Sequence, residues 1–192
     1  MAFDHNDHYH PLLLRQVPSG AATALDVGCG TGLFARRLAA RGVVVDAVDP
    51  AREVIEAAPP AMGVRYRHAD ITTMDLPEAH YDFVSCLASL HHVPFETVRR
   101  LHRAPAPGGV LAVLGCYRES TPSDFLTSLA AVPVNAAARL ALSRRPQAPV
   151  RAPVKPPAMT LGEVREGAAR LLPDARVRRL LFWRYLLVSR RP

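Results

Sequence analysis

Cysteine and long apolar runs are scarce in this chain of 192 residues, and each scarcity excludes a class of protein. The three cysteines, Cys29, Cys86 and Cys116, are odd in number and far apart. They therefore form neither a disulfide framework nor a Cys-x-x-Cys metal or redox pair. The longest apolar stretches, such as 110–114, are too short to cross a bilayer. The first residues are rich in Asp and His where a signal peptide needs an apolar core, so we expect a cytoplasmic protein without membrane contact.

Lysine is equally scarce, because Lys155 is the one lysine among 24 basic residues, and charge is distributed unevenly along the chain. Residues 139–192 hold 13 Lys+Arg against 3 Asp+Glu, whereas residues 1–138 hold 11 against 14. A basic face can attract nucleic acid or an anionic substrate. Only three aromatic residues, all within 182–185, accompany the main basic stretch, which is too few for a surface that stacks bases. A solvated basic surface is expected, and nucleic-acid binding is disfavoured.

Short β-like runs alternate with helix-like segments, a pattern typical of a parallel sheet with helices on both faces. The expected strands are 22–28, 43–48, 64–69, 81–87 and 110–116, followed by an antiparallel pair near 176–181 and 183–189. Helices are expected at 9–17, at 31–41 with Thr31 as its cap, at 51–58, after Pro94, and from Thr160 to Leu172. The length suits one domain with a full core, so residues 1–192 are predicted to form a single doubly wound α/β domain.

The stretch 118–158 departs from this alternation. It holds an Ala-rich helical segment, 125–142, and then a run with five prolines, which is typical of an extended, semi-rigid loop. The stretch leaves the fifth strand at the carboxyl edge of the sheet, where open α/β sheets bind ligands. We therefore expect 118–158 to be a lid insertion that roofs the substrate pocket together with an N-terminal cap helix in residues 1–20.

The clearest local signal is LDVGCGTG at residues 25–32, between the first strand and the first helix. Glycines there permit a tight turn and let a ligand approach bare backbone. The dinucleotide fingerprint needs glycine at its first, third and sixth positions, whereas here Leu33 occupies the sixth. This mismatch disfavours NAD or FAD. Asp49 ends the second strand beside the loop, where a ribose diol is bound in such sheets.

Five ordered motifs resemble those of class I S-adenosylmethionine-dependent methyltransferases. They are LDVGCGTG (25–32), VDAVDP (45–50), HADI (68–71), YDFVSCLASLHHV (81–93) and APAPGGVLAVLG (104–115). The chain is most similar to the small-molecule group that includes ubiquinone/menaquinone methyltransferase-like proteins. The resemblance implies a Rossmann-like fold with a mostly parallel seven-stranded sheet and an antiparallel C-terminal strand pair. It also implies S-adenosyl-L-methionine as cofactor, S-adenosyl-L-homocysteine as product, and methylation of an O or N atom of a small molecule.

The resemblance also assigns cofactor contacts to residues at the strand ends. The methionine and ribose would be held by Asp26 and by the loop Gly28, Cys29, Gly30, Thr31 and Gly32. The ribose hydroxyls would lie at Asp49 and Pro50, and adenine would contact Asp70 and Ile71. The backbone of Cys86 and Leu87 would pass beneath the cofactor. Many relatives carry Asn or another polar residue at the position of Leu87, so one polar contact to the substrate is missing here. Taken singly, Asp49 could cap the next helix and Asp70 could lie in a turn. A carboxylate at Asp26 among apolar strand residues needs a partner.

Methyl transfer from a sulfonium is an in-line displacement that mainly requires an aligned nucleophile, with a base only where that nucleophile is protonated. Histidine suits such a base at neutral pH. The candidate catalytic residues are Tyr9 and His10 in the N-terminal helix and His91 after the fourth strand, each with packing or capping as its alternative. Tyr117 and Arg118 are candidates for the pocket wall, where Arg118 could hold a carboxylate or phosphate, or could simply lie at the surface. The histidines at 5, 8 and 10 have no cysteine nearby, so no metal site is expected.

Two other functions remain open. The basic C-terminal third could belong to an RNA or protein methyltransferase, although residues 86–89 are Cys-Leu-Ala-Ser where an Asn-Pro-Pro-Tyr-type tetrad would mark methylation of base amino groups. The chain could also be a non-catalytic fold-mate that binds the cofactor, since an intact glycine loop does not prove turnover. A monomer or homodimer is expected.

Overall fold

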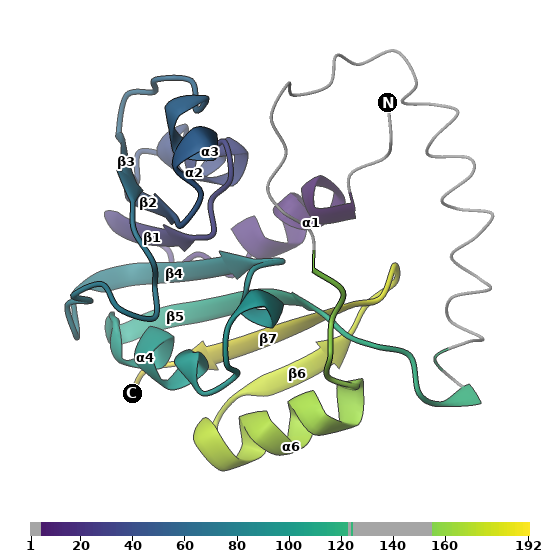
Figure 1. Cartoon of the computed structure of the whole chain (residues 1–192). Coiled ribbons are helices and arrows are strands. Elements are labelled where there is room, and N and C mark those ends of the chain that lie inside the picture. Colours follow the sequence, from purple (N-terminus) through teal and green to yellow (C-terminus); the bar gives the residue numbers. More distant parts are fainter. Residues whose placement is uncertain (1–4, 123, 125–154) are drawn as a thin grey trace.

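The fold is a seven-stranded sheet with helices on both faces, seen in a computed structural model that describes residues 5–122, 124 and 155–192 (Figure 1). The strands are β1 (Thr23–Val27), β2 (Val44–Asp49), β3 (Val64–His68), β4 (Tyr81–Leu87), β5 (Pro105–Cys116), β6 (Arg176–Arg179) and β7 (Arg184–Arg190). The helices are α1 (His5–Leu14), α2 (Leu33–Ala39), α3 (Arg52–Glu56), the 3-10 helix η1 (Leu90–His92), α4 (Thr97–Arg103) and α6 (Leu161–Leu171).

The order of the strands in the sheet is β3-β2-β1-β4-β5-β7-β6. The pairs among β1 to β5 are parallel, whereas β7 pairs antiparallel with both β5 and β6. The predicted doubly wound sheet with an antiparallel C-terminal pair is therefore confirmed. The chain moves outward from β1 in one direction and resumes at β4 on its other side, so the carboxyl ends of β1 and β4 form the switch point where such sheets bind ligands.

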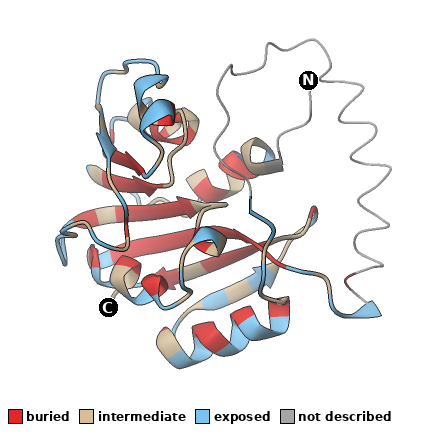
Figure 2. Ribbon diagram, viewed as in Figure 1, coloured by how far each residue is buried: buried red, intermediate tan, exposed pale blue. Residues whose placement is uncertain are grey.

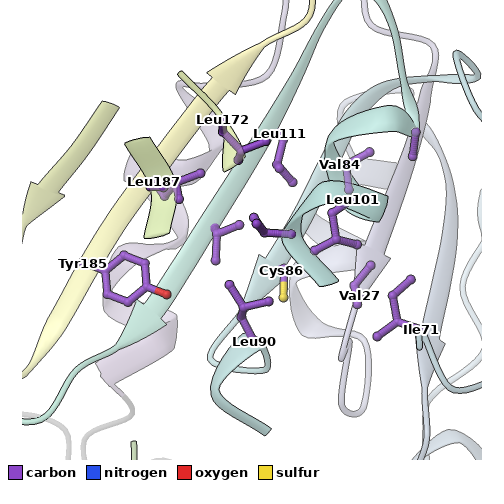
Figure 3. Packing of buried hydrophobic residues seen from close by; sticks show 14 of the residues in the cluster. Val27, Ile71, Val84, Cys86, Leu90, Leu101, Leu111, Leu172, Tyr185 and Leu187 are labelled. Atoms are coloured by element: carbon purple, nitrogen blue, oxygen red, sulfur yellow. The ribbon is translucent and has the colours of Figure 1, made fainter. Parts of the chain in front are cut away.

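Alternate residues of the central strands enter two apolar cores, one on each face of the sheet (Figure 2). The first core lies beneath η1, α4 and α6 and includes Leu101, Leu111 and Leu187 (Figure 3). The second lies beneath α1 and α2 and includes Leu13 and Phe34. Full burial of such a side chain contributes roughly 1.5–3 kcal/mol, so burial on both faces favours this sheet register.

The helix starts show where local capping chemistry could and could not be predicted. Thr160 caps α6 as expected, because its side chain accepts from the backbone N–H of Glu163 while that carboxylate accepts from the N–H of Thr160. The prediction that Thr31 caps α2 is wrong. Gly32 occupies the cap position with φ of 75° and no side chain bonds the first turn, because the left-handed loop continues to that residue.

Other boundaries also differ from the sequence expectations. Strand β5 begins at Pro105 rather than 110, so the expected turn at Gly108 and Gly109 lies within the strand. A Cβ on Gly109 would lie 2.9 Å from the carbonyl oxygen of Tyr81, which explains the small residue there. The helix expected after Pro94 is α4, and η1 precedes it. The helix expected at 125–142 lies outside the described residues.

Candidate cofactor and acceptor site

The glycine loop lies at the carboxyl ends of β1 and β2. Gly28, Gly30 and Gly32 have φ of 66°, 55° and 75°, a region that favours glycine. The N–H groups of Gly28 and Cys29 both donate to the carbonyl of Val48, at 2.8 and 3.1 Å, which fixes the loop to the end of β2.

The three glycines differ in what surrounds them. A Cβ on Gly28 would lie 1.8 Å from Oγ of Ser89, and one on Gly32 would lie 2.3 Å from the ring of Tyr66. These two positions are therefore closed by packing within the protein. Among the described residues other than its two chain neighbours, no atom lies within 4 Å of the Cβ position of Gly30, so its backbone faces open space that a ligand can approach.

Asp49 connects this loop to the start of α3. It is 5% exposed, its Oδ2 accepts from the N–H of Gly30 at 2.9 Å, and its Oδ1 accepts from the N–H of Ala51 at 2.9 Å. Asp49 does not cap α3, because the cap residue is Ala51; its bond to the N–H of Ala51 instead fixes the turn before that helix. Because each carboxylate oxygen has a second lone pair, the predicted contact with ribose hydroxyls is compatible with both bonds.

Asp26 is an almost fully buried carboxylate near the end of β1. Its Oδ1 accepts from the hydroxyl of Ser85 at 2.8 Å, whereas its Oδ2 has no hydrogen-bond partner among the described residues. Burial raises the pKa of Asp26 to about 7, against the lowering effect of the Ser85 hydroxyl. A cationic ligand group beside the loop would supply the missing partner. The donor set therefore fits a ligand that carries an ammonium group, as S-adenosylmethionine does.

The predicted adenine contacts lie at the end of β3. Asp70 is exposed, and its Oδ1 accepts from the backbone N–H and the hydroxyl of Thr72 at 2.8 and 2.7 Å. These bonds lower the pKa of Asp70 and form the turn that was the alternative for this residue. Ile71 is buried at the margin of the first core. The chain therefore presents an ionised carboxylate beside an apolar side chain, and the contact with adenine stays a prediction.

The thiols near the loop are neutral packing groups. Burial raises the pKa of Cys86 to about 12, and burial also raises the pKa of Cys29. Leu87 is half-buried against the second core, and Pro50 is exposed, with its carbonyl 3.0 Å from Nε2 of His68. The backbone at Cys86 and Leu87 lies beside the glycine loop, as expected from the pairing of β4 with β1.

Ser89 was not singled out by the sequence. Its hydroxyl lies 2.8 Å from the carbonyl of Leu87 and 3.3 Å from that of Gly28, which joins the end of β4 to the glycine loop. The signal was weak because Gly28 and Ser89 are 61 positions apart and a serine after a strand is common.

His91 lies in η1, just beyond β4. Burial, then the positive charges of His92 and Arg184, lower the pKa of His91 to about 4, so its ring is neutral at pH 7. Its Nδ1 has no hydrogen-bond partner among the described residues. The structure therefore gives His91 a buried ring nitrogen that could accept a proton or a hydrogen bond.

Tyr9 and His10 instead pack α1 on the second core. Tyr9 is 7% exposed and its hydroxyl donates to the carbonyl of Leu181 at 3.0 Å, while burial raises its pKa. The ring of His10 is 3% exposed and packs edge-on to Phe34, with centroids 4.9 Å apart. These contacts are those of the packing alternative, and their catalytic role stays a prediction.

The described ends of the 118–158 stretch are attached to the sheet. The backbone N–H of Arg118 donates to the carbonyl of Met159 at 2.8 Å, and its Nε donates to the carbonyl of Ala158 at 3.1 Å. Arg118 is exposed, so its described contacts fix the returning chain, and a role in holding an acceptor stays a prediction. Tyr117 is buried in the first core.

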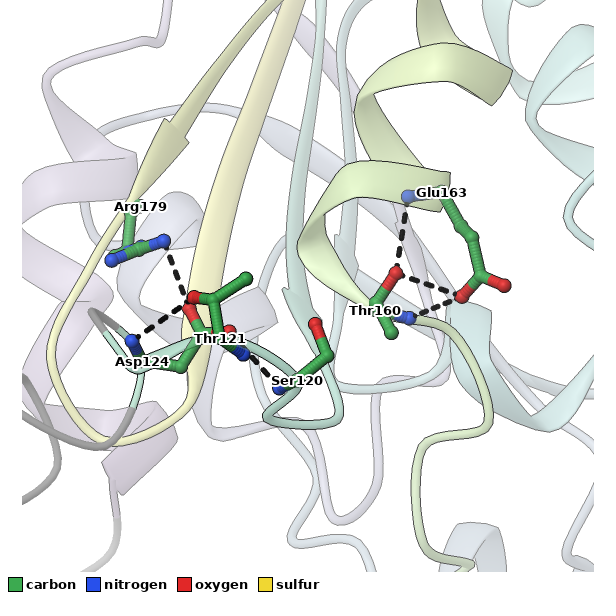
Figure 4. A network of polar contacts seen from close by, with 6 residues as sticks. All are labelled: Ser120, Thr121, Asp124, Thr160, Glu163 and Arg179. Carbon is green, nitrogen blue, oxygen red and sulfur yellow. Dashed lines mark hydrogen bonds and ion pairs between the residues drawn. The ribbon is translucent and has the colours of Figure 1, made fainter.

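Asp124 forms a second attachment. Its Oδ2 accepts from the N–H groups of Ser120 and Thr121, and its Oδ1 pairs with Arg179 of β6 at 2.8 Å (Figure 4). Burial alone would raise the pKa of Asp124, but these bonds together lower it. Both described ends of the stretch thus meet the sheet at its carboxyl edge.

Metal-binding clusters and membrane-spanning helices are both absent from the described residues. No group of three or more His, Cys, Asp or Glu side chains there is arranged to hold a metal ion. No helix in the described part of the chain is long and apolar enough to span a membrane.

Comparison with other proteins agrees with the geometry of the glycine loop. The sequence profile of the family described as "Methyltransferase domain" matches residues 25–113. An uncharacterised methyltransferase of Mycobacterium tuberculosis is 38% identical over 192 residues, which cover 97% of this chain and 96% of the relative. The chain belongs to the class I S-adenosylmethionine-dependent methyltransferases. The predicted family and cofactor are thereby confirmed.

Two further similarities describe parts of this methyltransferase. A ubiquinone biosynthesis O-methyltransferase of Pseudomonas syringae pv. tomato is 37% identical over 93 residues, 44% of this chain and 40% of the relative. A solved S-adenosylmethionine-dependent methyltransferase from Listeria monocytogenes superposes with a TM-score of 0.63 over 96% of this chain and 97% of its own, at 13% identity. The latter shows a shared fold.

Proposed function

We propose that this methyltransferase transfers the methyl group to an O or N atom of a small metabolite, and that Asp26, the glycine loop and Asp49 hold the cofactor. The observation that carries the proposal is the buried carboxylate of Asp26 near the end of β1, of which one oxygen has no hydrogen-bond partner among the described residues. Burial raises the pKa of Asp26 to about 7, and a bound ammonium group would favour its ionised form and supply the missing partner. Asp70, Ile71 and the backbone of Cys86 and Leu87 are proposed to line the adenine end.

The cofactor supplies an activated methyl group on a sulfonium, which leaves as a neutral sulfide. The acceptor atom forms a bond to the methyl carbon while the carbon–sulfur bond breaks, so a protonated acceptor must lose one proton. We propose that Nδ1 of His91 accepts this proton or orients the acceptor group, because it is neutral and unpartnered. A histidine with a pKa of about 4 is a weak base, so it suits an acidic hydroxyl better than an alkyl alcohol or a protonated amine.

The walls of the acceptor pocket are proposed to be α1, η1 and the stretch 118–158, acting as a roof over the carboxyl edge. Support comes from the attachment of Arg118 to Ala158 and Met159, and of Asp124 to Arg179, at that edge. The partial similarity to a ubiquinone biosynthesis O-methyltransferase supports a small-molecule acceptor. The protein is further proposed to act in the cytoplasm as a monomer or homodimer.

Incubation with methyl-labelled S-adenosylmethionine tests this proposal. The acceptors are a panel of phenols, catechols, carboxylic acids and amines, with total RNA and a protein extract as separate arms. Label in a small molecule is expected, whereas label in RNA or protein would support the rival methyltransferase function. Calorimetric binding of the cofactor without transfer to any arm would support a non-catalytic role.

A further inference from the structure

Arg184 occupies a distinctive position at the carboxyl edge of the sheet. It is the first residue of β7 and pairs with Cys116, the last residue of β5. Leu114 pairs with Leu87 at the end of β4, so Arg184 lies two residues beyond the level at which β4 ends. The guanidinium group is therefore on the edge that also carries the glycine loop and η1.

Neutral groups hold this guanidinium in place. Its Nε donates to Oδ1 of Asn6 in α1 at 3.1 Å, and its Nη1 donates to the carbonyl of Phe182 at 3.1 Å. No carboxylate in the described part of the chain forms an ion pair with Arg184, whereas Arg65 pairs with Asp46 and Arg179 with Asp124. Arg184 is half-buried, and a guanidinium has five N–H donors, so donors remain for a ligand.

The turn before Arg184 is strained. Phe182 and Trp183 have φ of 58° and 57°, which is unfavourable for bulky side chains. The burial of Phe182 and the hydrogen bond from the N–H of Leu180 to the carbonyl of Arg184 maintain the turn. Strain of this kind clusters at functional sites, and this turn aims the Phe182 carbonyl at the guanidinium and so fixes the orientation of Arg184.

The charge of Arg184 acts on groups from three elements that surround the expected acceptor position. Burial and the charge of His92 are the larger causes of the lowered pKa of His91 in η1, and the charge of Arg184 is the next. Its charge lowers the pKa of Tyr9 in α1 and of Cys116 in β5, and so partly offsets the effect of burial, which raises both pKa values. Burial, and then the positive charge of Lys155, lowers the pKa of His92, so Lys155 is a second positive charge near this edge. This edge therefore carries positive charge beside His91, which favours an anionic ligand.

We propose that Arg184 binds a carboxylate on the methyl acceptor, so that the enzyme acts on small carboxylic acids that also carry the atom to be methylated. This inference rests on the proposed small-molecule methyl transfer. Arginine is suited to the task because its planar N–H donors match the geometry of a carboxylate. An oriented arginine would also place the hydroxyl or amine of the acceptor at a fixed position relative to His91.

A matched acid and amide test this proposal directly. The probes are 3,4-dihydroxybenzoate and 3,4-dihydroxybenzamide, which share a ring and hydroxyls and differ in charge. Each is titrated calorimetrically into enzyme saturated with S-adenosylhomocysteine, and methyl transfer to each is then measured. In the wild-type enzyme the acid is expected to bind at least about 10-fold more tightly than the amide.

Arg184→Gln should lower the affinity for the acid by about 10- to 100-fold, leave the affinity for the amide within about 3-fold, and leave S-adenosylhomocysteine binding unchanged. Arg184→Lys should restore part of the preference. The control is Arg190→Gln, because Arg190 lies exposed at the other end of β7 and should not affect either affinity. Melting temperatures of all variants identify any general loss of the fold.

Either of two binding results overturns the proposal: equal binding of acid and amide by the wild-type enzyme, or an equal loss of both in Arg184→Gln. The second result would make Arg184 a structural contact of α1. Methyl transfer to acid and amide at equal rates would leave the proposed function standing while the role of Arg184 fails. If the acid binds selectively but the label is found in RNA or protein, the role of Arg184 in binding a carboxylate stands while the proposed function fails.

Discussion

The hydroxyl of Tyr9 donates a hydrogen bond of 3.0 Å to the carbonyl of Leu181, and so joins α1 to the β6–β7 turn across 172 positions of the chain. Arg184, the first residue of β7, forms a second bond to α1 through Asn6. Together with the burial of Leu13, these bonds place α1 over the second core at the carboxyl edge.

The first prediction is that Tyr9→Phe lowers the free energy of unfolding by about 0.5–1.5 kcal/mol, the usual net contribution of one hydrogen bond. Because burial raises the pKa of Tyr9 and its hydroxyl already donates to the carbonyl of Leu181, the rate of methyl transfer should change little. Urea denaturation and steady-state kinetics measure the two effects. A fall in kcat of more than about 10-fold at unchanged stability and cofactor affinity would instead make Tyr9 catalytic, since proton transfer by a positioned side chain contributes at least that much.

The second prediction concerns the pH dependence of stability. The folded protein keeps a proton on Asp26 that the unfolded chain releases, since its pKa is raised from 3.8 to about 7. The free energy of unfolding should therefore fall as the pH rises through this window. Asp26→Asn should remove that part of the slope, and urea denaturation at a series of pH values measures it. Parallel pH profiles for the two proteins would show that Asp26 is ionised throughout.

The third prediction separates backbone strain from ligand contact at the glycine loop. Gly30→Ala should weaken S-adenosylmethionine binding at least about 10-fold, because its Cβ would project into the space that the ligand approaches. Gly42→Ala is the matched control: Gly42 has φ of 85° and equally open space, but it precedes β2 at the opposite edge of the sheet. Calorimetry should show normal affinity for that variant. Equal affinities of the two variants would place the cofactor elsewhere.

The sequence was sufficient for the sheet and the loop because both depend on local patterns. Apolar runs such as 81–87 predicted β4, and three alternating glycines predicted a loop that approaches a ligand. It was not sufficient for Thr31, because the backbone conformation of Gly32, rather than the preference of a threonine, decides where α2 starts.

Contacts between distant residues were equally inaccessible to sequence patterns. Ser89 lies 61 positions from Gly28, and Arg184 lies 178 positions from Asn6. Each pair meets only because the strand order brings β4 beside β1 and places β7 beside β5. A serine and an arginine in these places have no local signal, so their roles follow from packing alone.

The fourth prediction tests the acid at the end of β2. Asp49→Ala should weaken S-adenosylmethionine binding by ~1–3 kcal/mol, through loss of charge-assisted bonds to the ribose and of the bond that holds Gly30. Calorimetry on a variant whose circular dichroism matches that of wild type measures this. Unchanged affinity would mean that the ribose is bound by other groups.

The fifth prediction concerns His91 and its neighbour His92, two histidines that follow the same strand. His91 has an unpartnered Nδ1 and a pKa lowered to about 4, first by burial, whereas His92 is exposed. If His91 accepts the proton of the acceptor, His91→Gln should lower kcat by about 10²–10⁴-fold with normal cofactor affinity, and His92→Gln should leave kcat unchanged.

The pH profile gives an independent test of the same role. In wild type, activity should stay level as the pH falls through 6.5, the ordinary pKa of histidine, and should decline only as it approaches about 4. A decline centred near 6.5 would assign the proton to a more exposed group. Equal activity of His91→Gln and wild type would mean that the acceptor loses its proton without His91.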